Sequence, residues 1–361
     1  MLKSVQLTGK ELTKTALVSF LTEPVRRAQN GEKLYPFSNL GLAVELVRVL
    51  NKEGYAVDVV EWNDTKLPRN KTYDLFIGHA SINFSQLMST NTFGKTIYFA
   101  TGSSAIFHNA EAQKRSDEFW QRHKVRIKPD RMVDPKEAKI YGLADVVICL
   151  GNSRIASTFD VEHIEHLNIA ASPMRPLLLP RVGKSAKHIL FFSGGGNLHK
   201  GLDLAIESVI DTDLTLHVCT IIDEKFLNVY RKLYSPEQLK NVKFHGFVAH
   251  GSRLFRQLIR RCQFVLLLSC SEGSPGSLID IMQYGLIPVV TPACGLDVAK
   301  VGFVVEGIKI KDISKLLLRA SRTPKVELKQ LSDQTKQLVK DDFSRADFDT
   351  KLSSAIRRLT Q

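Results

Sequence analysis

The sequence contains no uncharged apolar run of the roughly 18 residues that a membrane-spanning helix needs. It shows no basic and apolar leader followed by a small-residue cleavage site. Its five cysteines are an odd number without C-x-x-C spacing, so buried free thiols are expected rather than disulfides or a zinc site. These features predict a cytoplasmic protein in a reducing compartment, with at most a peripheral contact to the inner membrane face.

Motifs for nucleic acids and metals are also missing. No segment gathers basic and aromatic residues in the manner of a nucleic-acid-binding module, and no carboxylate cluster indicates a metal site. The formal net charge is nevertheless +13, which attracts phosphates, nucleic acids and anionic membranes alike. A basic surface without a special role explains this charge equally well. We expect no specific nucleic-acid binding, and weak contact with anionic membranes through basic stretches such as residues 122–131.

Short apolar runs alternate with amphipathic stretches along the whole chain, which is typical of parallel sheets covered by helices. A length of 361 residues suits two domains, and the prolines of residues 172–187 indicate the connection between them. We therefore expect an α/β protein with two Rossmann-like domains. Their predicted ranges are 1–175 and 186–343, and a terminal helix at 344–361 would pack back on the N-terminal domain.

The predicted strands of the first domain are residues 16–21, 56–62, 74–78, 96–100 and 145–150, with a helix at 39–50. Those of the second domain are residues 188–193, 214–220, 242–248, 264–269, 287–291 and 303–305. Its predicted helices are residues 200–210, 252–262, 277–284 and 312–322.

The segment FFSGGGNLHKGLDLAIES, residues 191–208, carries the first candidate site. A strand runs into three glycines, and Lys200 is expected to open the next helix. Glycines let the backbone approach a bulky anion, while helix-start amides and a lysine attract its charge. The spacing matches neither a Walker loop nor G-x-G-x-x-G, and a purely structural turn stays open as an alternative. The residues assigned to this phosphate site are Gly194, Gly195, Gly196, Asn197, His199 and Lys200.

The second candidate site lies in FVLLLSCSEGSPGSLIDIMQYGLIPVVT, residues 264–291. A buried strand is followed by a loop with Glu272, and the next helix carries Asp280. Two acidic residues therefore flank a helix start, whose unpaired amides favour an anion nearby. Parallel strands bind ligands at this end, so both segments are expected to open toward one ligand.

Together these segments resemble the group 1 family of retaining glycosyltransferases. EGSPGSLIDIMQYGLIPVV is similar to the family's E-x7-E signature, HKGLDL resembles its lysine-glycine donor segment, and VKFHGFV at residues 242–248 resembles its strand-glycine-aromatic step. The resemblance covers most of the second half of the chain and only loosely the first half. It implies a glycosyltransferase B fold, with the two domains facing each other across a cleft.

The resemblance also implies roles for single residues. Lys200 would neutralise the diphosphate of a nucleotide-sugar donor, Glu272 would lie beside the donor sugar, and Asp280 would bind the ribose hydroxyls. Amides from Ser274, Gly276 and Ser277 would approach the sugar or the phosphates. The acceptor would be a polysaccharide, a lipid-linked glycan or another hydroxyl compound held by the N-terminal domain. The donor is a substrate, and no cofactor or metal is implied.

The sequence departs from the family at two positions. Family members commonly carry an arginine five positions before the lysine, where this chain has Gly195. The second acidic residue is Asp280 rather than glutamate. Residues 277–280, SLID, also read as a capping box with Ser277 as the N-cap, so Asp280 is either a ligand contact or a cap.

His108 is a further catalytic candidate, because it follows a predicted strand in the loop TGSSAIFHN. A polar loop residue without a catalytic role is an equal alternative. Two other functions stay open for the whole chain: a non-hydrolysing nucleotide-sugar epimerase of the same fold, and a binding or scaffold protein that has lost catalysis. The missing arginine is the feature that points to the latter.

Overall fold

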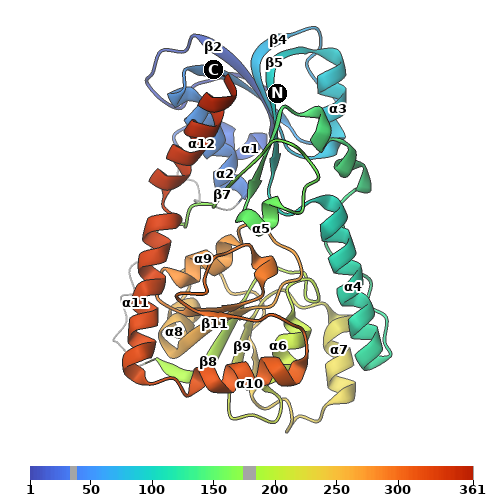
Figure 1. Ribbon diagram of the computed structural model, residues 1–361, viewed down its shortest axis with the longest axis vertical. Helices are drawn as coiled ribbons and strands as arrows, with labels where there is room; N and C mark the ends of the chain where they lie inside the picture. The colour runs from blue at the N-terminus through green and yellow to red at the C-terminus, as the bar shows by residue number, and fades with distance from the viewer. Residues whose placement is uncertain (33–38, 174–183, 361) are drawn as a thin grey trace. The chain divides into compact units, whose positions relative to one another are not determined.

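The computed structural model describes residues 1–32, 39–173 and 184–360 of the chain. The chain forms two compact units, each built on one β-sheet (Figure 1). The first unit comprises Met1–Ile106, Val133–Pro173 and Phe343–Gln361, and the second comprises Phe107–Met132 and Met174–Asp342. The predicted class, α/β with two Rossmann-like parts, is confirmed.

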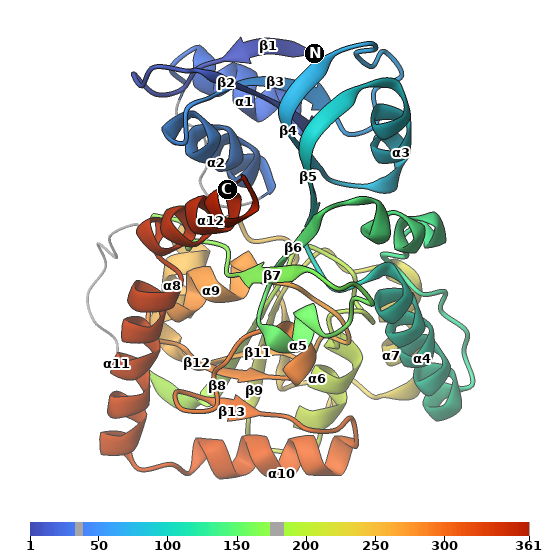
Figure 2. The same ribbon diagram turned by 45° about the horizontal axis from the view of Figure 1, so that its top comes forward.

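The sheet of the first unit has seven strands in the order β1-β3-β2-β4-β5-β6-β7 (Figure 2). Only β1 runs antiparallel to its neighbour. Every residue of β6 is buried, as expected of a parallel strand covered on both faces. The strands are β1 (Leu2–Val5), β2 (Lys14–Phe20), β3 (Tyr55–Glu61), β4 (Thr72–Gly78), β5 (Thr92–Ala100), β6 (Val146–Leu150) and β7 (Ile164–Leu167). The helices are α1 (Thr22–Gln29), α2 (Asn39–Lys52), α3 (Ser81–Thr90), α5 (Ser153–Ala156) and the short 3-10 helices η1 (Pro135–Lys139) and η2 (Tyr141–Leu143).

The last helix, α12 (Arg345–Thr360), returns to the first unit and packs beside α2 (Figure 2). Its Phe348 side chain is fully buried, so the apolar stripe of the helix completes the core of this unit. At the edge of the contact, Arg345 donates to Glu45 of α2 at 2.5 Å. The chain thus ends in the unit in which it begins.

The sheet of the second unit has six parallel strands in the order β10-β9-β8-β11-β12-β13, which reverses between β8 and β11. The strands are β8 (Ser185–Phe192), β9 (Thr215–Cys219), β10 (Val242–Phe244), β11 (Cys262–Leu267), β12 (Ile287–Val290) and β13 (Phe303–Val304). The helices are α6 (Leu202–Val209), α7 (Glu224–Leu233), α8 (Arg253–Arg261), α9 (Gly276–Met282), η3 (Pro292–Cys294), α10 (Ile310–Ser321) and α11 (Lys325–Asp342). Within the predicted connection 172–187, residues 174–183 lie outside the described residues and Ser185–Lys187 begin β8.

Alternating side chains of β8 build the two faces of this core. Phe191 packs with the residues of α6, α7 and α10 in one cluster. Phe192 points to the other face, where its ring meets Phe255 of α8 edge-on at a centroid distance of 5.6 Å. Because successive side chains point to opposite faces, helices pack on both faces of the sheet. The loops at the strand ends are then available to bind a ligand.

Most of helix α4 (Ala105–His123) packs on the second unit, although its sequence lies in the first half. Phe119 is fully buried in the core of that unit, and its ring stacks with Phe226 of α7 at 6.0 Å. Arg122 forms an ion pair with Asp203 of α6. The predicted first domain, 1–175, included this segment. The periodicity of α4 shows that one face is apolar, but it does not reveal which core receives that face.

Candidate functional site

Two loops of the second unit meet at the place where the order of its strands reverses. One follows β8 and contains Gly194 to Gly196, and the other follows β11 and contains Glu272. β8 and β11 are hydrogen-bonded neighbours, and the next strand after each lies on the opposite side. In open parallel sheets, ligands bind outside the carboxyl ends of the strands at this reversal. The two sequence motifs therefore occupy the position expected of a ligand site.

Gly201 allows the two loops to approach each other. Its backbone is left-handed, with φ +75°, and a Cβ atom there would lie 2.2 Å from the carbonyl oxygen of Leu268. Any side chain would push the loop after β11 away from the loop after β8. The sequence prediction did not single out Gly201, although it is part of the HKGLDL segment.

The glycine-rich loop leaves its backbone open. A Cβ atom on Gly194 or Gly195 would meet nothing within 4 Å, while Gly196 has φ +83°. Lys200 lies in the turn that follows, where its N–H donates to the Gly196 carbonyl at 2.8 Å, and α6 begins only at Leu202. The expectation that Lys200 opens the helix is wrong, because the left-handed Gly201 comes between them.

The Asn197 side chain supports the glycine-rich loop through two hydrogen bonds. Its side-chain amide donates to the Ile221 carbonyl at 2.9 Å, and its side-chain oxygen accepts from the Asp223 N–H at 2.7 Å. Both ends of the amide are thus used within the protein. The structure places Asn197 as a support of the loop after β8, next to the other residues of the predicted phosphate site.

Lys200 and Glu272 are brought together by the two loops. The Lys200 ammonium group donates to Glu272 Oε1, and both side chains are about nine-tenths buried. Ser269 Oγ donates to the same oxygen at 2.7 Å, and His199 Nε2 lies 3.4 Å from it. The predicted residues Lys200, His199 and Glu272 therefore form one cluster. Ser269 was not predicted, although it ends the apolar run before Glu272.

This cluster fixes the charge of Glu272. Burial by itself favours the neutral carboxyl group, but the Lys200 ammonium and the His199 ring outweigh it. Together they hold the pKa of Glu272 well below its usual range. Glu272 is therefore a carboxylate at neutral pH, so it accepts hydrogen bonds and cannot serve as a proton donor.

His108 joins the same cluster from α4. The sequence predicted a loop at this position, but His108 lies in the first turns of the helix. Its ring lies 4.9 Å from the ring of His199, measured between centroids, and its Nδ1 lies 3.2 Å from Ser271 Oγ. Its Nε2 lies 2.6 Å from the carbonyl oxygen of Arg131.

These contacts define the tautomer of His108. A carbonyl oxygen can only accept, so Nε2 carries the proton and donates to Arg131, and Nδ1 accepts from the Ser271 hydroxyl. Burial lowers the pKa of His108, and the neighbouring His199 ring lowers it further. Both ring nitrogens of His108 are therefore engaged within the protein, and Nδ1 orients the Ser271 hydroxyl.

Asp280 lies in α9 and is buried, with its Oδ2 3.9 Å from His250 Nε2. The capping-box alternative is wrong. Helix α9 starts at Gly276 after Pro275, which makes no side-chain cap, so Ser277 is already inside the helix. Asp280 therefore does not reach back to an N-cap serine, and the ligand contact stays as its predicted role. Ser274 is buried in the loop before the helix.

Two features at this place suit an anion. Lys200 supplies a full charge, and the open glycines expose amides. In residues 1–32, 39–173 and 184–360, no three His, Cys, Asp or Glu side chains are grouped as a metal site. Over the same ranges, none of the helices has the length and apolar character of a bilayer span.

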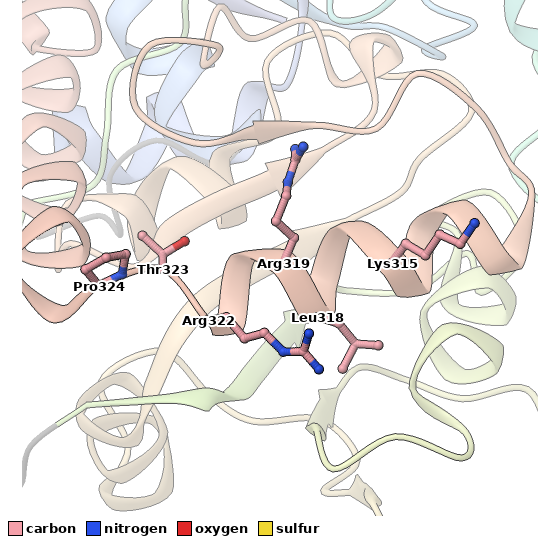
Figure 3. A pocket seen from close by; sticks show the side chains of 6 residues that line it. All are labelled: Lys315, Leu318, Arg319, Arg322, Thr323 and Pro324. Atoms are coloured by element: carbon pink, nitrogen blue, oxygen red, sulfur yellow. The ribbon is translucent and has the colours of Figure 1, made fainter.

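A separate surface pocket of the second unit lies along α10 and its end (Figure 3). It has a volume of about 490 Å³ and contains no residue of either loop. Its lining is basic and includes Lys315, Arg319 and Arg322. It therefore adds nothing to the cluster around Glu272.

Comparison with known families concerns the second unit. Residues 180–338 match the family model of the group 1 glycosyl transferases. This range contains both loops, α6 and α9, and it omits the histidine on α4. No curated protein sequence matches the chain significantly.

Solved structures share the fold at low identity. A TarM variant of S. aureus, in complex with fondaparinux, alpha-GlcNAc-glycerol and UDP, is 16% identical with a TM-score of 0.55, over 80% of this chain and 55% of that one. Sucrose-phosphate synthase from Thermosynechococcus elongatus is 13% identical with a TM-score of 0.66, over 97% and 99%. HepE of Anabaena, in complex with UDP and glucose, is 12% identical with a TM-score of 0.55, over 96% and 100%. The chain thus spans about half the length of TarM, and these likenesses confirm the glycosyltransferase B type of fold.

Proposed function

Since residues 180–338 match the family model of the group 1 glycosyl transferases, we propose that this chain transfers a sugar from a nucleotide-diphosphate sugar to a hydroxyl group of an acceptor. The acceptor classes that we consider are polysaccharides and lipid-linked glycans. The observation that carries the proposal is the Lys200–Glu272 pair, which joins the two loops where the strand order reverses. A cation and an anion held together suit a donor with a charged diphosphate and a neutral sugar.

The donor would lie across both loops. Lys200 and the amides of the open glycines would bind the diphosphate, because they present positive charge without a side chain in the way. The loop amides before and within the first turn of α9 would approach the sugar or the phosphates, and Asp280 would accept from the ribose hydroxyls. Complexes of TarM and HepE contain UDP, which makes a uridine nucleotide the first donor to test.

The reaction that we propose retains the anomeric configuration. The acceptor oxygen bonds to the anomeric carbon on the face from which the diphosphate leaves, the electron pair of the broken bond goes to the diphosphate, and a diphosphate oxygen takes the acceptor proton. Glu272 is held as a carboxylate and orients the sugar rather than protonating it. Lys200 stabilises the charge that develops on the leaving group. The enzyme's part is thus positioning and electrostatic stabilisation.

A peripheral contact with anionic membranes remains part of this proposal, with a smaller set of residues than the sequence suggested. Within residues 122–131, Arg122 pairs with Asp203 and His123 with Glu207, so both side chains are engaged within the protein. Arg126 is exposed. Flotation with neutral and anionic vesicles tests the contact, and equal flotation with both would eliminate it.

The function is tested by mixing the full chain with a panel of nucleotide sugars and acceptors and measuring the nucleoside diphosphate released. We expect release that depends on the acceptor, with the anomeric configuration of the product determined by NMR. Product formed without an acceptor would indicate the epimerase. A chain that releases nothing and whose melting temperature no nucleotide shifts would contradict the proposal, because a ligand at about 100 times its Kd adds about 2.7 kcal/mol to the folded state.

A further inference from the structure

The glycine-rich loop has one cation for an anion that carries more than one charge. Gly195 stands where the family pattern has an arginine, so Lys200 is the basic side chain that the loop itself provides. A diphosphate has several charged oxygens, and each is most stable when a cation or an amide lies beside it. A second cation, if the chain has one, must reach the loop from another segment.

The segment at the end of Phe107–Met132 reaches this loop. The position that a Cβ atom would occupy on Gly196 lies 2.7 Å from Cδ of Arg131. The backbone N–H of His199 donates to Asp130 Oδ1 at 3.3 Å. The Arg131 side chain therefore crosses the glycine-rich loop directly, and any residue other than glycine at 196 would displace it.

The protein holds Arg131 in this place. Its backbone is left-handed, with φ +62°, which is uncommon for a residue with a side chain. His108 Nε2 donates to its carbonyl oxygen at 2.6 Å. Since His108 also contacts Ser271 and lies against His199, Arg131 is tied to both loops of the site.

The charge of Arg131 is available. The residue is exposed, and its guanidinium group has no ion-pair partner in the described parts of the chain. It differs in this from Arg122 and Arg126 of the same segment, which pair with Asp203 and Asp117. Its charge lies close enough to the cluster to lower the pKa of His108.

We propose that Arg131 is a donor-binding residue, which supplies the second cation for the diphosphate in place of the arginine absent at position 195. The inference rests on the proposed function. It assigns the charge to a segment outside the matched family range 180–338, and it gives the packing of α4 on the second unit a role in the site. Asp130 keeps the segment in place through the His199 amide, at some cost in repulsion of the anion.

The experiment measures nucleotide binding by calorimetry on the full chain and on three variants. UDP, GDP and ADP are tried with the wild type, and the tightest of them is compared with its monophosphate. Arg131→Gln should weaken diphosphate binding roughly 10-fold to 100-fold, because a hydrogen bond to a charged group is lost. The loss should be smaller for the monophosphate. Arg131→Lys should recover part of the affinity, since it restores a cation.

Arg126→Gln is the matched control, because Arg126 lies on the same segment, is exposed and pairs with Asp117. It should bind like the wild type. The melting temperatures of the Arg131 variants should equal that of the wild type, since the side chain is exposed. Wild-type or tighter binding by Arg131→Gln, or equal losses for the two nucleotides, would overturn the inference and leave the function intact. A wild type that binds none of the three diphosphates would overturn the function as well.

Discussion

Lys200 donates to Glu272 from a loop 72 residues earlier in the chain, and about a tenth of each side chain is exposed. The pair therefore neutralises two charges that would be costly to bury singly. A diphosphate that enters the site competes with Glu272 for the ammonium group. Ser269 and His199 also contact Glu272, so we expect the carboxylate to keep its position when Lys200 turns to the ligand. Substitutions of Lys200 and of Glu272 should therefore differ in their effects on nucleotide binding and on turnover.

Lys200→Ala should weaken nucleoside diphosphate binding and lower turnover by roughly 100-fold or more, because charge develops on the leaving group during the reaction. Calorimetry and initial rates measure the two effects. Lys187→Ala is the control, since Lys187 is exposed and pairs with Asp213 at the surface. A Lys200→Ala enzyme with the wild-type rate would show that the catalytic interpretation of this loop is mistaken.

Glu272→Gln should lower turnover by roughly 100-fold while the affinity for the bare nucleoside diphosphate stays equal or rises. The amide preserves the shape of the loop, but it no longer pairs with Lys200, whose charge becomes more available to the phosphates. Rates with a donor sugar and binding of the bare nucleotide are compared on the same preparation. Parallel losses of rate and nucleotide affinity would contradict the position of Glu272 beside the sugar.

The sequence predicted those features that depend on local pattern. Residue type and spacing alone identify the apolar runs of β8 and β11 and the turns after them. Lys200 and Glu272 could therefore be placed after the ends of these strands. The wrong predictions concern single turns. Gly201 separates Lys200 from α6, and Pro275 shifts the start of α9 so that Ser277 is not a cap. Neither residue changes the hydrophobic pattern.

The parts of the site that were missed depend on contacts between distant segments. Arg131 belongs to no motif and meets Gly196 only because α4 packs on the second unit. His108 was singled out, but its helix and its contact with Ser271 could not be predicted. An amphipathic pattern describes one side of a contact, and the partner must come from the tertiary structure.

Phe119→Ala tests whether α4 is part of the core of the second unit. Phe119 is fully buried there against Phe226, so its truncation should lower the free energy of unfolding by about 3–5 kcal/mol. Ile106→Ala, at an exposed position of the same helix, should change it by no more than about 0.5 kcal/mol. Urea denaturation measures both. A loss as small as that of the control would mean that α4 does not complete this core, and a fragment starting at residue 186 would then be stable without it.

Three histidines form a hydrogen-bonded row in the second unit: His188 of β8, His217 of β9 and His245, which directly follows β10. His188 Nδ1 lies 2.9 Å from His217 Nε2, and His217 Nδ1 lies 3.0 Å from His245 Nε2. Such a row is satisfied when every ring is neutral, because each contact then has one donor and one acceptor. Burial lowers the pKa of His217 to about 4, helped by its two histidine neighbours and by the nearby charges of Arg261 and Lys243.

This row should make the stability of the protein fall in acid. The pKa of an unfolded histidine is about 6.5 and that of folded His217 about 4, so the unfolded chain binds more protons between these values. The contribution is complete above about pH 6.5 and is lost as the pH falls toward 4, on the order of 2 kcal/mol from His217. We expect the free energy of unfolding of His217→Gln to depend less on pH in this window, so that the wild type and the variant converge in acid. His163→Gln, at an exposed position, should keep the wild-type slope. A difference between wild type and His217→Gln that stays constant from pH 7 to pH 4 would mean that the pKa of His217 is the same in the folded and the unfolded chain.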